Sequence, residues 1–106
     1  MATEAFAVPA DGLLGRKATV PEHVVYRDFV TETVVLNLET GHYHGINRTG
    51  GRILSALERA ETIGAAASAL AEEYGRSVTE VEGDVCAFCA DLLDRGLILL
   101  LPDGSD

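Results

Sequence analysis

The segment TVVLNLETGHYHGIN, residues 33–47, has the pattern of two β-strands joined by a tight turn. In TVVLNL, the apolar residues Val34, Leu36 and Leu38 alternate with their neighbours, which is the period of a strand that buries one face. HYHGIN, residues 42–47, resumes the extended pattern after the glycine-containing loop ETG. Two extended runs with so short a connection predict a β-hairpin.

The residues before the hairpin add a further strand. HVVYRDF, which begins at His23, is rich in β-branched and aromatic side chains, so we expect a three-stranded antiparallel sheet. Residues 1–22 contain Pro9 and Pro21 and show little periodicity. We therefore expect a mostly irregular N-terminal arm over residues 1–22, with some local order around Leu13–Leu14.

Two helices are predicted directly after the hairpin. Asn47 or Thr49 can cap the first, and Thr62 can cap the second, which ends at Gly75. Between these signals, apolar or small residues recur at the spacing of one helical face. They are Gly50, Ile53, Leu54 and Leu57 in the first helix, and Ile63, Ala66, Ala67, Leu70 and Tyr74 in the second.

A third helix begins with two overlapping capping boxes, Ser77 with Glu80 and Thr79 with Glu82, and Gly96 supplies its stop. LILLL, which follows, has the composition of a short closing strand. Strands followed by three helices predict an α+β, winged helix-turn-helix-like fold. We expect the domain to span 23–101 and a tail to span 102–106.

Length and composition predict one folded domain. The chain has 106 residues, of which 47% are hydrophobic, and it has no apolar run of about 18 residues that could cross a membrane. Its first residues lack the basic flank and long apolar core of a signal peptide. With only two cysteines, a reducing compartment is the simplest interpretation, and we expect a cytoplasmic protein.

Charge is distributed unevenly along the chain. Residues 1–60 carry seven acidic and six basic side chains, whereas residues 61–106 carry ten acidic and two basic ones. The second half would repel a phosphate backbone and attract a basic partner. DNA binding by a winged-helix transcriptional regulator remains the alternative that the fold raises, although the predicted third helix is acidic rather than basic.

Cys86 and Cys89 form a C-x-x-C pair, and three histidines are available as further ligands. Both cysteines lie inside a well-patterned helix, whereas structural zinc sites draw their cysteines from turns. Cys86 is two turns into the helix and close to Asp84, which does not favour a reactive thiolate. We therefore expect buried small side chains, no metal and no cofactor. The sequence also lacks a nucleophile motif or a phosphate-binding loop, so an enzyme is not expected.

The predicted third helix has an unusually wide apolar arc. Val81, Val85, Phe88 and Leu92 form one stripe, which we expect to face the core, and Cys86, Cys89 and Leu93 extend it to one side. Either that extension contacts a partner, or both sides are covered by the sheet and the N-terminal arm. The strand HYHGIN is a possible sheet edge that could accept an added peptide strand.

These motifs resemble the PqqD-like proteins, the precursor-peptide recognition elements of ribosomally synthesised and modified peptides, and most closely those of lasso-peptide biosynthesis. The resemblance covers roughly residues 24–101. Two residues depart from the pattern, His44 in place of a second aromatic and Leu54 in place of a Trp. The matching residues are Gly41, Tyr43, Gly45, Ile46 and Asn47, then Gly50 and Ile53, and finally Leu92, Leu93, Gly96 and Leu97.

The resemblance implies a non-catalytic adaptor. Such a protein would bind the leader peptide of a precursor as an added strand and present it to a transglutaminase-like leader-cleaving peptidase, without nucleic acid or membrane. The implied leader-binding residues are His42, Tyr43, His44, Gly45 and Ile46 on the strand, and Glu82, Val85, Cys86, Cys89 and Leu93 on the last helix.

Overall fold

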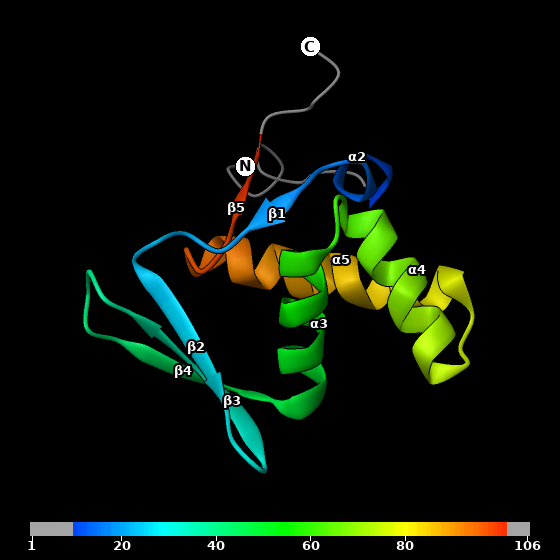
Figure 1. Cartoon of the computed structure of the whole chain (residues 1–106). Coiled ribbons are helices and arrows are strands. Elements are labelled where there is room, and N and C mark those ends of the chain that lie inside the picture. The colour runs from blue at the N-terminus through cyan, green and yellow to red at the C-terminus, as the bar shows by residue number, and fades with distance from the viewer. Residues whose placement is uncertain (1–9, 102–106) are drawn as a thin grey trace.

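The computed structural model describes residues 10–101 and has the predicted architecture, a small antiparallel sheet followed by three helices (Figure 1). The sheet lies to one side of the molecule and the three long helices pack together on the other. None of the described helices is long and apolar enough to cross a membrane. In chain order the elements are α2 (Ala10–Leu14), β1 (Ala18–Thr19), β2 (Val24–Asp28), β3 (Glu32–Asn37), β4 (Tyr43–Asn47), α3 (Arg48–Arg59), α4 (Ile63–Tyr74), α5 (Val78–Asp94) and β5 (Leu99–Leu100).

The three-stranded sheet has the order β2-β3-β4, so β4 is an edge strand that pairs only with β3. The β3–β4 turn is closed by the Asn37 N–H, which donates to the His42 carbonyl over 2.9 Å, and by the Asn37 side chain, which accepts from the Glu39 N–H. Gly41 has φ 77°, a left-handed conformation that favours glycine. The predicted hairpin is therefore confirmed.

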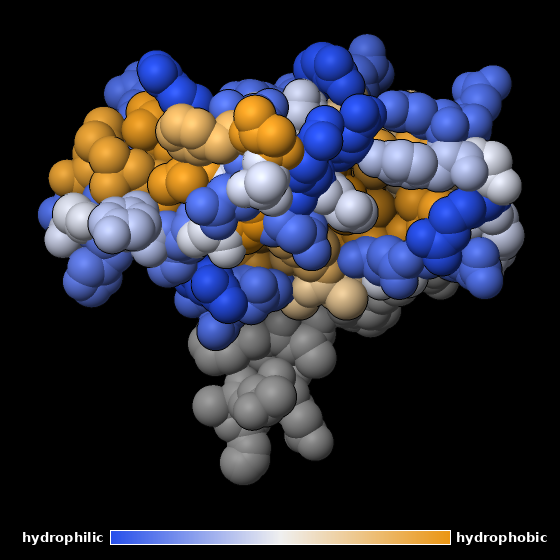
Figure 2. Space-filling view, turned by 90° about the horizontal axis from the view of Figure 1, so that it is seen from below, coloured by the Kyte–Doolittle hydropathy of each residue, from blue (hydrophilic) through white to orange (hydrophobic). Residues whose placement is uncertain are grey.

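The buried face of β3 is opposite to the one that its pattern indicates. Thr33 and Val35 are buried, whereas Val34 and Leu36 are partly exposed and Leu38, just beyond the strand, is 57% exposed. Both faces of this strand carry apolar residues, and α3 packs on the face with Thr33 and Val35. The outer face remains open, and Figure 2 shows apolar side chains exposed on the sheet side of the molecule.

A pair of glycines sets how closely α3 approaches the sheet. A Cβ on Gly51 would lie 2.0 Å from the Thr33 hydroxyl, so the first turn of α3 packs directly on β3. On the other side of the helix, a Cβ on Gly50 would lie 3.1 Å from the Phe88 ring of α5. The start of α3 is thereby held between the sheet and α5.

The predicted helix signals are confirmed. Asn47 caps α3 by accepting from the Gly50 N–H over 2.7 Å, and Thr62 caps α4 by accepting from the Ala65 N–H over 3.0 Å. Ser77, rather than Thr79, is the cap of α5. Left-handed glycines follow both later helices, at Gly75 (φ 66°) and Gly96 (φ 73°).

The described part of the N-terminal segment is not irregular, which corrects the expectation for residues 10–22. The helix α2 packs against α4 and α5, and β1 pairs with β5 in a separate two-stranded ribbon. Leu13 and Ala18 are buried in the core. Lys17 Nζ donates to the carbonyls of Leu57, Glu58 and Ala60 at the end of α3, where a cation is favourable. Residues 10–22 therefore belong to the domain, and residues 1–9 and 102–106 lie outside the described range.

Candidate functional site

A groove of about 440 Å³ runs between the free edge of β4, the start of α3 and one side of α5. Its floor is apolar, and its rim carries an amide, a hydroxyl and a carboxylate. The lining residues are Gly45, Ile46, Asn47, Thr49, Gly50, Ile53, Asp84 and Phe88.

The free edge of β4 offers unpaired backbone groups next to this groove. In an antiparallel pair, residues alternate between those bonded to the partner strand and those whose N–H and C=O point away from it. The Asn37 N–H donates to the His42 carbonyl, so His44 and Ile46 are also bonded to β3. Tyr43 and Gly45 therefore direct their backbone N–H and C=O groups toward the free edge.

The apolar floor is formed where three elements meet. Ile46 on β4 and Phe88 on α5 are both partly buried and pack against the core, and Ile53 on α3 is buried. Gly50 leaves room for the Phe88 ring, because a Cβ at this position would lie only 3.1 Å from that ring. Such a floor can accept an apolar side chain from an extended peptide, since burial of one Leu-sized side chain contributes about 1.5–3 kcal/mol.

The rim of the groove on α5 is polar. Asp84, Phe88 and Arg95 lie at helical spacing on the side of α5 that faces β4. Arg95 Nη1 lies 3.4 Å from His44 Nδ1 and its Nε donates to the Asp91 carboxylate over 3.2 Å, which links the end of α5 to β4. Asp84 is exposed at the other end of the groove, where Arg76 lies 3.5 Å away.

The strand residues named from the sequence divide between two faces. Gly45 and Ile46 line the groove, and His44 faces α5 through its contact with Arg95. Tyr43 pairs with Leu36 on the outer face of the sheet and is 74% exposed. His42 is exposed and precedes β4, and its N–H donates to the Thr40 hydroxyl. The structure thus places Gly45 and Ile46 in the groove and His44 beside Arg95, whereas the side chains of His42 and Tyr43 do not line the groove.

The helix residues named from the sequence do not line this groove. Val85, Cys86 and Cys89 are buried in the core, and Leu93 packs against it. At about 100° per residue, Glu82, Cys86 and Leu93 lie roughly 160–200° around the helix from Asp84. Phe88, which the sequence pattern places in the core stripe, lines the groove instead.

The extended apolar arc of α5 has a structural cause. This helix is covered on one side by α4 and also by α2, an element that the sequence pattern does not reveal. Cys86 and Cys89 are therefore part of the core, but α4 and α2 pack on α5, rather than the sheet and the N-terminal arm on both of its sides. The residues that sequence reasoning missed are Asn47, Thr49, Gly50, Ile53, Asp84 and Phe88, and the i, i+4 spacing of Asp84 and Phe88 is a signal that could have found two of them.

The two cysteines of α5 lie in the interior of the domain. Both are buried and neither forms a disulfide. Burial, and then the neighbouring Cys86, raises the pKa of the Cys89 thiol from 9.0 to about 12, so it stays protonated at neutral pH. Among residues 10–101, no three His, Cys, Asp or Glu side chains are grouped as metal ligands would be.

The fold and this site together define a winged-helix-like domain with an open strand edge beside an apolar groove. The chain matches the family model of coenzyme PQQ synthesis protein D (PqqD) over residues 32–98, more than half of its length. It belongs to the PqqD family, as the sequence motifs predict.

Two solved structures are similar to this chain. One, described as TbiB1 in complex with the TbiA(beta) leader peptide, is 31% identical, with a TM-score of 0.68, and the match covers 76% of this chain and 93% of that chain. The other, lasso peptide synthetase B1 complexed with the leader peptide, is 23% identical with a TM-score of 0.69, over 78% and 98% of the two chains, and supports the fold. No curated protein matches the chain.

Proposed function

We propose that this protein is a non-catalytic adaptor that binds the leader peptide of a ribosomally made precursor, the precursor of a lasso peptide. The observation that carries the proposal is the free edge of β4 beside a groove with an apolar floor. The proteins in both similar structures are described as complexes with leader peptides, which supports the same use of this fold.

The leader would add as a fourth strand of the sheet. Its backbone would exchange hydrogen bonds with Tyr43 and Gly45, which supply affinity with little regard to sequence. Alternate leader side chains would enter the groove, where one apolar side chain would contact Ile46 and Phe88. A basic leader residue near Asp84 would find a carboxylate at the rim.

The bound leader would be presented to a leader-cleaving peptidase of the transglutaminase-like class, in the cytoplasm. In this proposal the peptidase supplies the chemistry and the adaptor supplies the strand edge and the groove that hold the leader. DNA is a poorer occupant, because α5 carries five acidic side chains and no basic one within its bounds.

Fluorescence anisotropy tests this proposal with a fluorescently labelled leader peptide of a lasso-peptide precursor. We expect saturable binding by the wild-type chain, weak binding of a scrambled leader of equal composition, and no binding of a short DNA duplex. A two-dimensional amide NMR spectrum should shift mainly at residues 43–50 and around Phe88. Equal affinity for the scrambled leader, or shifts confined to another surface, would overturn the proposal.

A further inference from the structure

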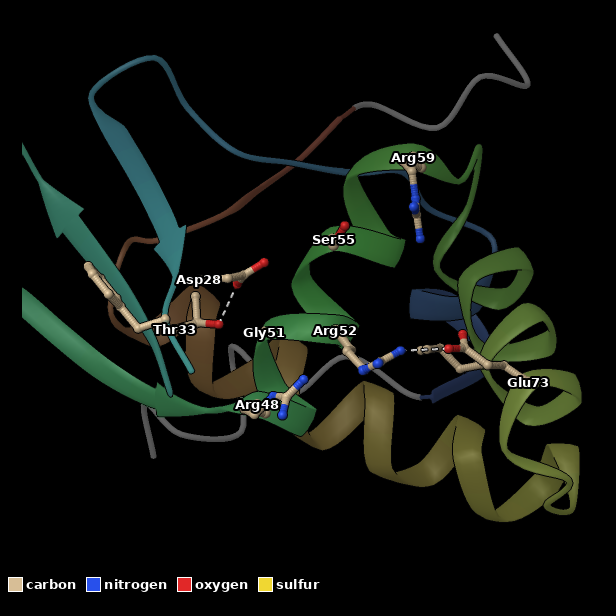
Figure 3. Close-up of a pocket in the computed structure, with 10 residues that line it drawn as sticks. Asp28, Thr33, Arg48, Gly51, Arg52, Ser55, Arg59 and Glu73 are labelled. Atoms are coloured by element: carbon tan, nitrogen blue, oxygen red, sulfur yellow. Dashed lines mark hydrogen bonds and ion pairs between the residues drawn. The ribbon is translucent and has the colours of Figure 1, made fainter. Parts of the chain in front are cut away.

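A second cavity, of about 490 Å³, lies on another side of α3, between the end of the β2–β3 hairpin and α4. Figure 3 shows Arg48, Arg52 and Arg59 along one side of α3, with Asp28 on the sheet side and Glu73 on the α4 side. We call this cavity the arginine cleft.

The arginine cleft and the β4–α5 groove use different sides of the same helix. Successive residues of a helix are about 100° apart around its axis. Gly50, in the groove, therefore lies roughly 180° around α3 from Arg59, in the cleft, and Ile53 lies roughly 120° from Arg59. One ligand in the groove and another in the cleft would therefore not overlap. The cleft is not part of the leader site proposed above, and its argument does not depend on that site.

The two acidic groups of the cleft are already engaged. Glu73 accepts from Arg52 over 2.7 Å, and Asp28 accepts from the Thr33 hydroxyl over 2.6 Å. Arg48 and Arg59, in contrast, have no ion pair or side-chain hydrogen bond with the residues that the structure describes. Two guanidinium groups thus remain available in a chain whose net charge is −9.

The position of Arg48 is not explained by helix stability. It is the first residue of α3, and no acidic residue lies in that first turn. A cation at a helix N-terminus opposes the helix dipole. The dipole and Arg48 both make this end of the cleft attractive to an anion, and Arg59 adds a charge at the other end.

The cleft also has an apolar rim. Phe29, in the turn between β2 and β3, lines the cavity and is 54% exposed, and the neighbouring Val30 is 83% exposed. Exposed aromatic and arginine side chains together are typical of protein-binding surfaces. A dense polyanion such as nucleic acid fits less well, because Asp28 and Glu73 form two of the walls.

We propose that the arginine cleft binds an acidic peptide segment of a protein partner, with carboxylates on Arg48 and Arg59 and an apolar side chain against Phe29. Arginine pairs with carboxylates through two parallel hydrogen bonds, which gives such a contact direction as well as charge. A partner held here would contact the protein while the groove on the other side of α3 stays accessible.

The probe is a synthetic acetylated Glu-Glu-Leu-Glu-Glu amide, titrated into the ¹⁵N-labelled full chain, with Gln-Gln-Leu-Gln-Gln as the uncharged match. We expect the acidic peptide to shift the amide signals of Gly51 and Ser55 and the Nε signals of Arg48 and Arg59. The double variant R48Q/R59Q should raise the apparent Kd about tenfold, the loss expected for two charge-assisted contacts. Arg27→Gln, which removes an exposed arginine on the outer face of the sheet, should leave the Kd unchanged.

Melting temperature and an unchanged spectrum outside the cleft establish that the double variant is folded. Absence of shifts at the cleft, equal shifts with the glutamine peptide, or an unchanged Kd in the double variant would overturn the proposal. A short DNA duplex that binds more tightly than the peptide, and loses binding in the same variant, would also overturn it, because the cleft would then be a nucleic-acid site.

Discussion

Phe88 and Cys89 are adjacent in sequence but belong to different parts of the molecule. Phe88 is partly buried and lines the groove, whereas Cys89 is 0% exposed in the core. We expect Phe88→Ala to retain the fold and to weaken leader binding by about 1–3 kcal/mol, the scale of an anchoring contact. Cys89→Asp should instead destabilise the domain by more than about 3 kcal/mol, because it buries an unpaired charge.

The measurements are thermal melting for stability and anisotropy with a labelled leader for affinity. Cys89→Ser is the matched control, since it keeps the size of the side chain and adds no charge. A folded Phe88→Ala variant with wild-type leader affinity would remove Phe88 from the binding site. A Cys89→Asp variant that melts like wild type would mean that this side of α5 is not core.

The raised pKa of Cys89 predicts a loss of stability in alkali. Its folded pKa, about 12, lies above the ordinary value of 9.0, so the folded state holds the proton more tightly than the unfolded chain does. The stabilisation is complete below about pH 9 and is lost as the pH rises toward 12. Burial, and then the hydrogen bond to Glu58, raises the pKa of Tyr26 from 10.0 to about 12. The contribution of Tyr26 to stability is therefore also lost as the pH rises above about 10.

Urea denaturation from pH 8 to pH 11 measures this dependence. We expect the free energy of unfolding to fall less steeply between pH 9 and pH 11 in a Cys89→Ala variant than in wild type. Near pH 8 the two curves should run parallel. An identical alkaline slope in both proteins would show that the Cys89 thiol does not contribute.

At the scale of elements, the register of β4 separates two kinds of backbone position. Tyr43 points its N–H to the free edge, whereas the N–H of His44 bonds to β3. Proline is tolerated at an edge position whose N–H faces solvent, but it removes a ladder bond elsewhere. We expect Tyr43→Pro to keep the sheet and lose leader affinity, and His44→Pro to damage the hairpin itself.

Tyr43→Ala separates the backbone from the side chain, which is largely exposed on the outer face. This variant should bind the leader nearly as well as wild type. Circular dichroism monitors the fold and anisotropy the affinity. Wild-type affinity in a folded Tyr43→Pro variant would contradict strand addition at this edge, and a loss in Tyr43→Ala as large as in Tyr43→Pro would assign the effect to the ring.

The helix α2 helps to determine which side of α5 borders the groove. Because α2 and α4 cover the cysteine side of α5, the opposite side with Asp84 and Phe88 remains for the groove. Lys17 holds the following segment to the C-terminal end of α3 through three carbonyls. The N-terminal residues 10–22 therefore orient two of the three elements that form the groove.

At the scale of the whole molecule, the net charge of −9 should influence which leaders bind. Ten of the seventeen acidic residues lie in residues 61–106, the segment that contains α5 and the rim residue Asp84. We expect a leader with Lys or Arg near Asp84 to bind less tightly as salt rises, because the Debye length shortens from about 10 Å at 0.1 M to about 3 Å at 1 M. Exposed pairs contribute only about 0–1 kcal/mol each, so the change should be small.

The variant Asp84→Asn measures how much of the salt dependence of leader binding comes from the Asp84 carboxylate. In a salt titration of leader binding, the variant should show a shallower dependence than wild type and similar affinity at high salt. Affinity that rises steadily with salt in the wild-type chain would refute the electrostatic contribution and leave the apolar floor as the main source of affinity.

Local signals predicted the three-stranded sheet, the three long helices and the family of this chain. The turn at Gly41, the caps at Asn47, Thr62 and Ser77, and the stop at Gly96 each depend on a few neighbouring residues, so the sequence contains them completely. The edge position of β4 and the order of sheet and helices follow from the same patterns. The motifs that resemble the PqqD family are made of these same turn and cap residues.

The faces that bury or bind depend instead on what packs against each element. Val34 and Val35 are equally apolar, and only the approach of α3 over Gly51 buries Val35 and leaves the Val34 face open. Likewise α5 is apolar over a wide arc, and the packing of α2 and α4 makes Cys89 core and Phe88 groove. The periodicity of a sequence indicates which faces of an element are apolar. Which of those faces is buried depends on the segments that pack against it, and these segments lie far away in the chain.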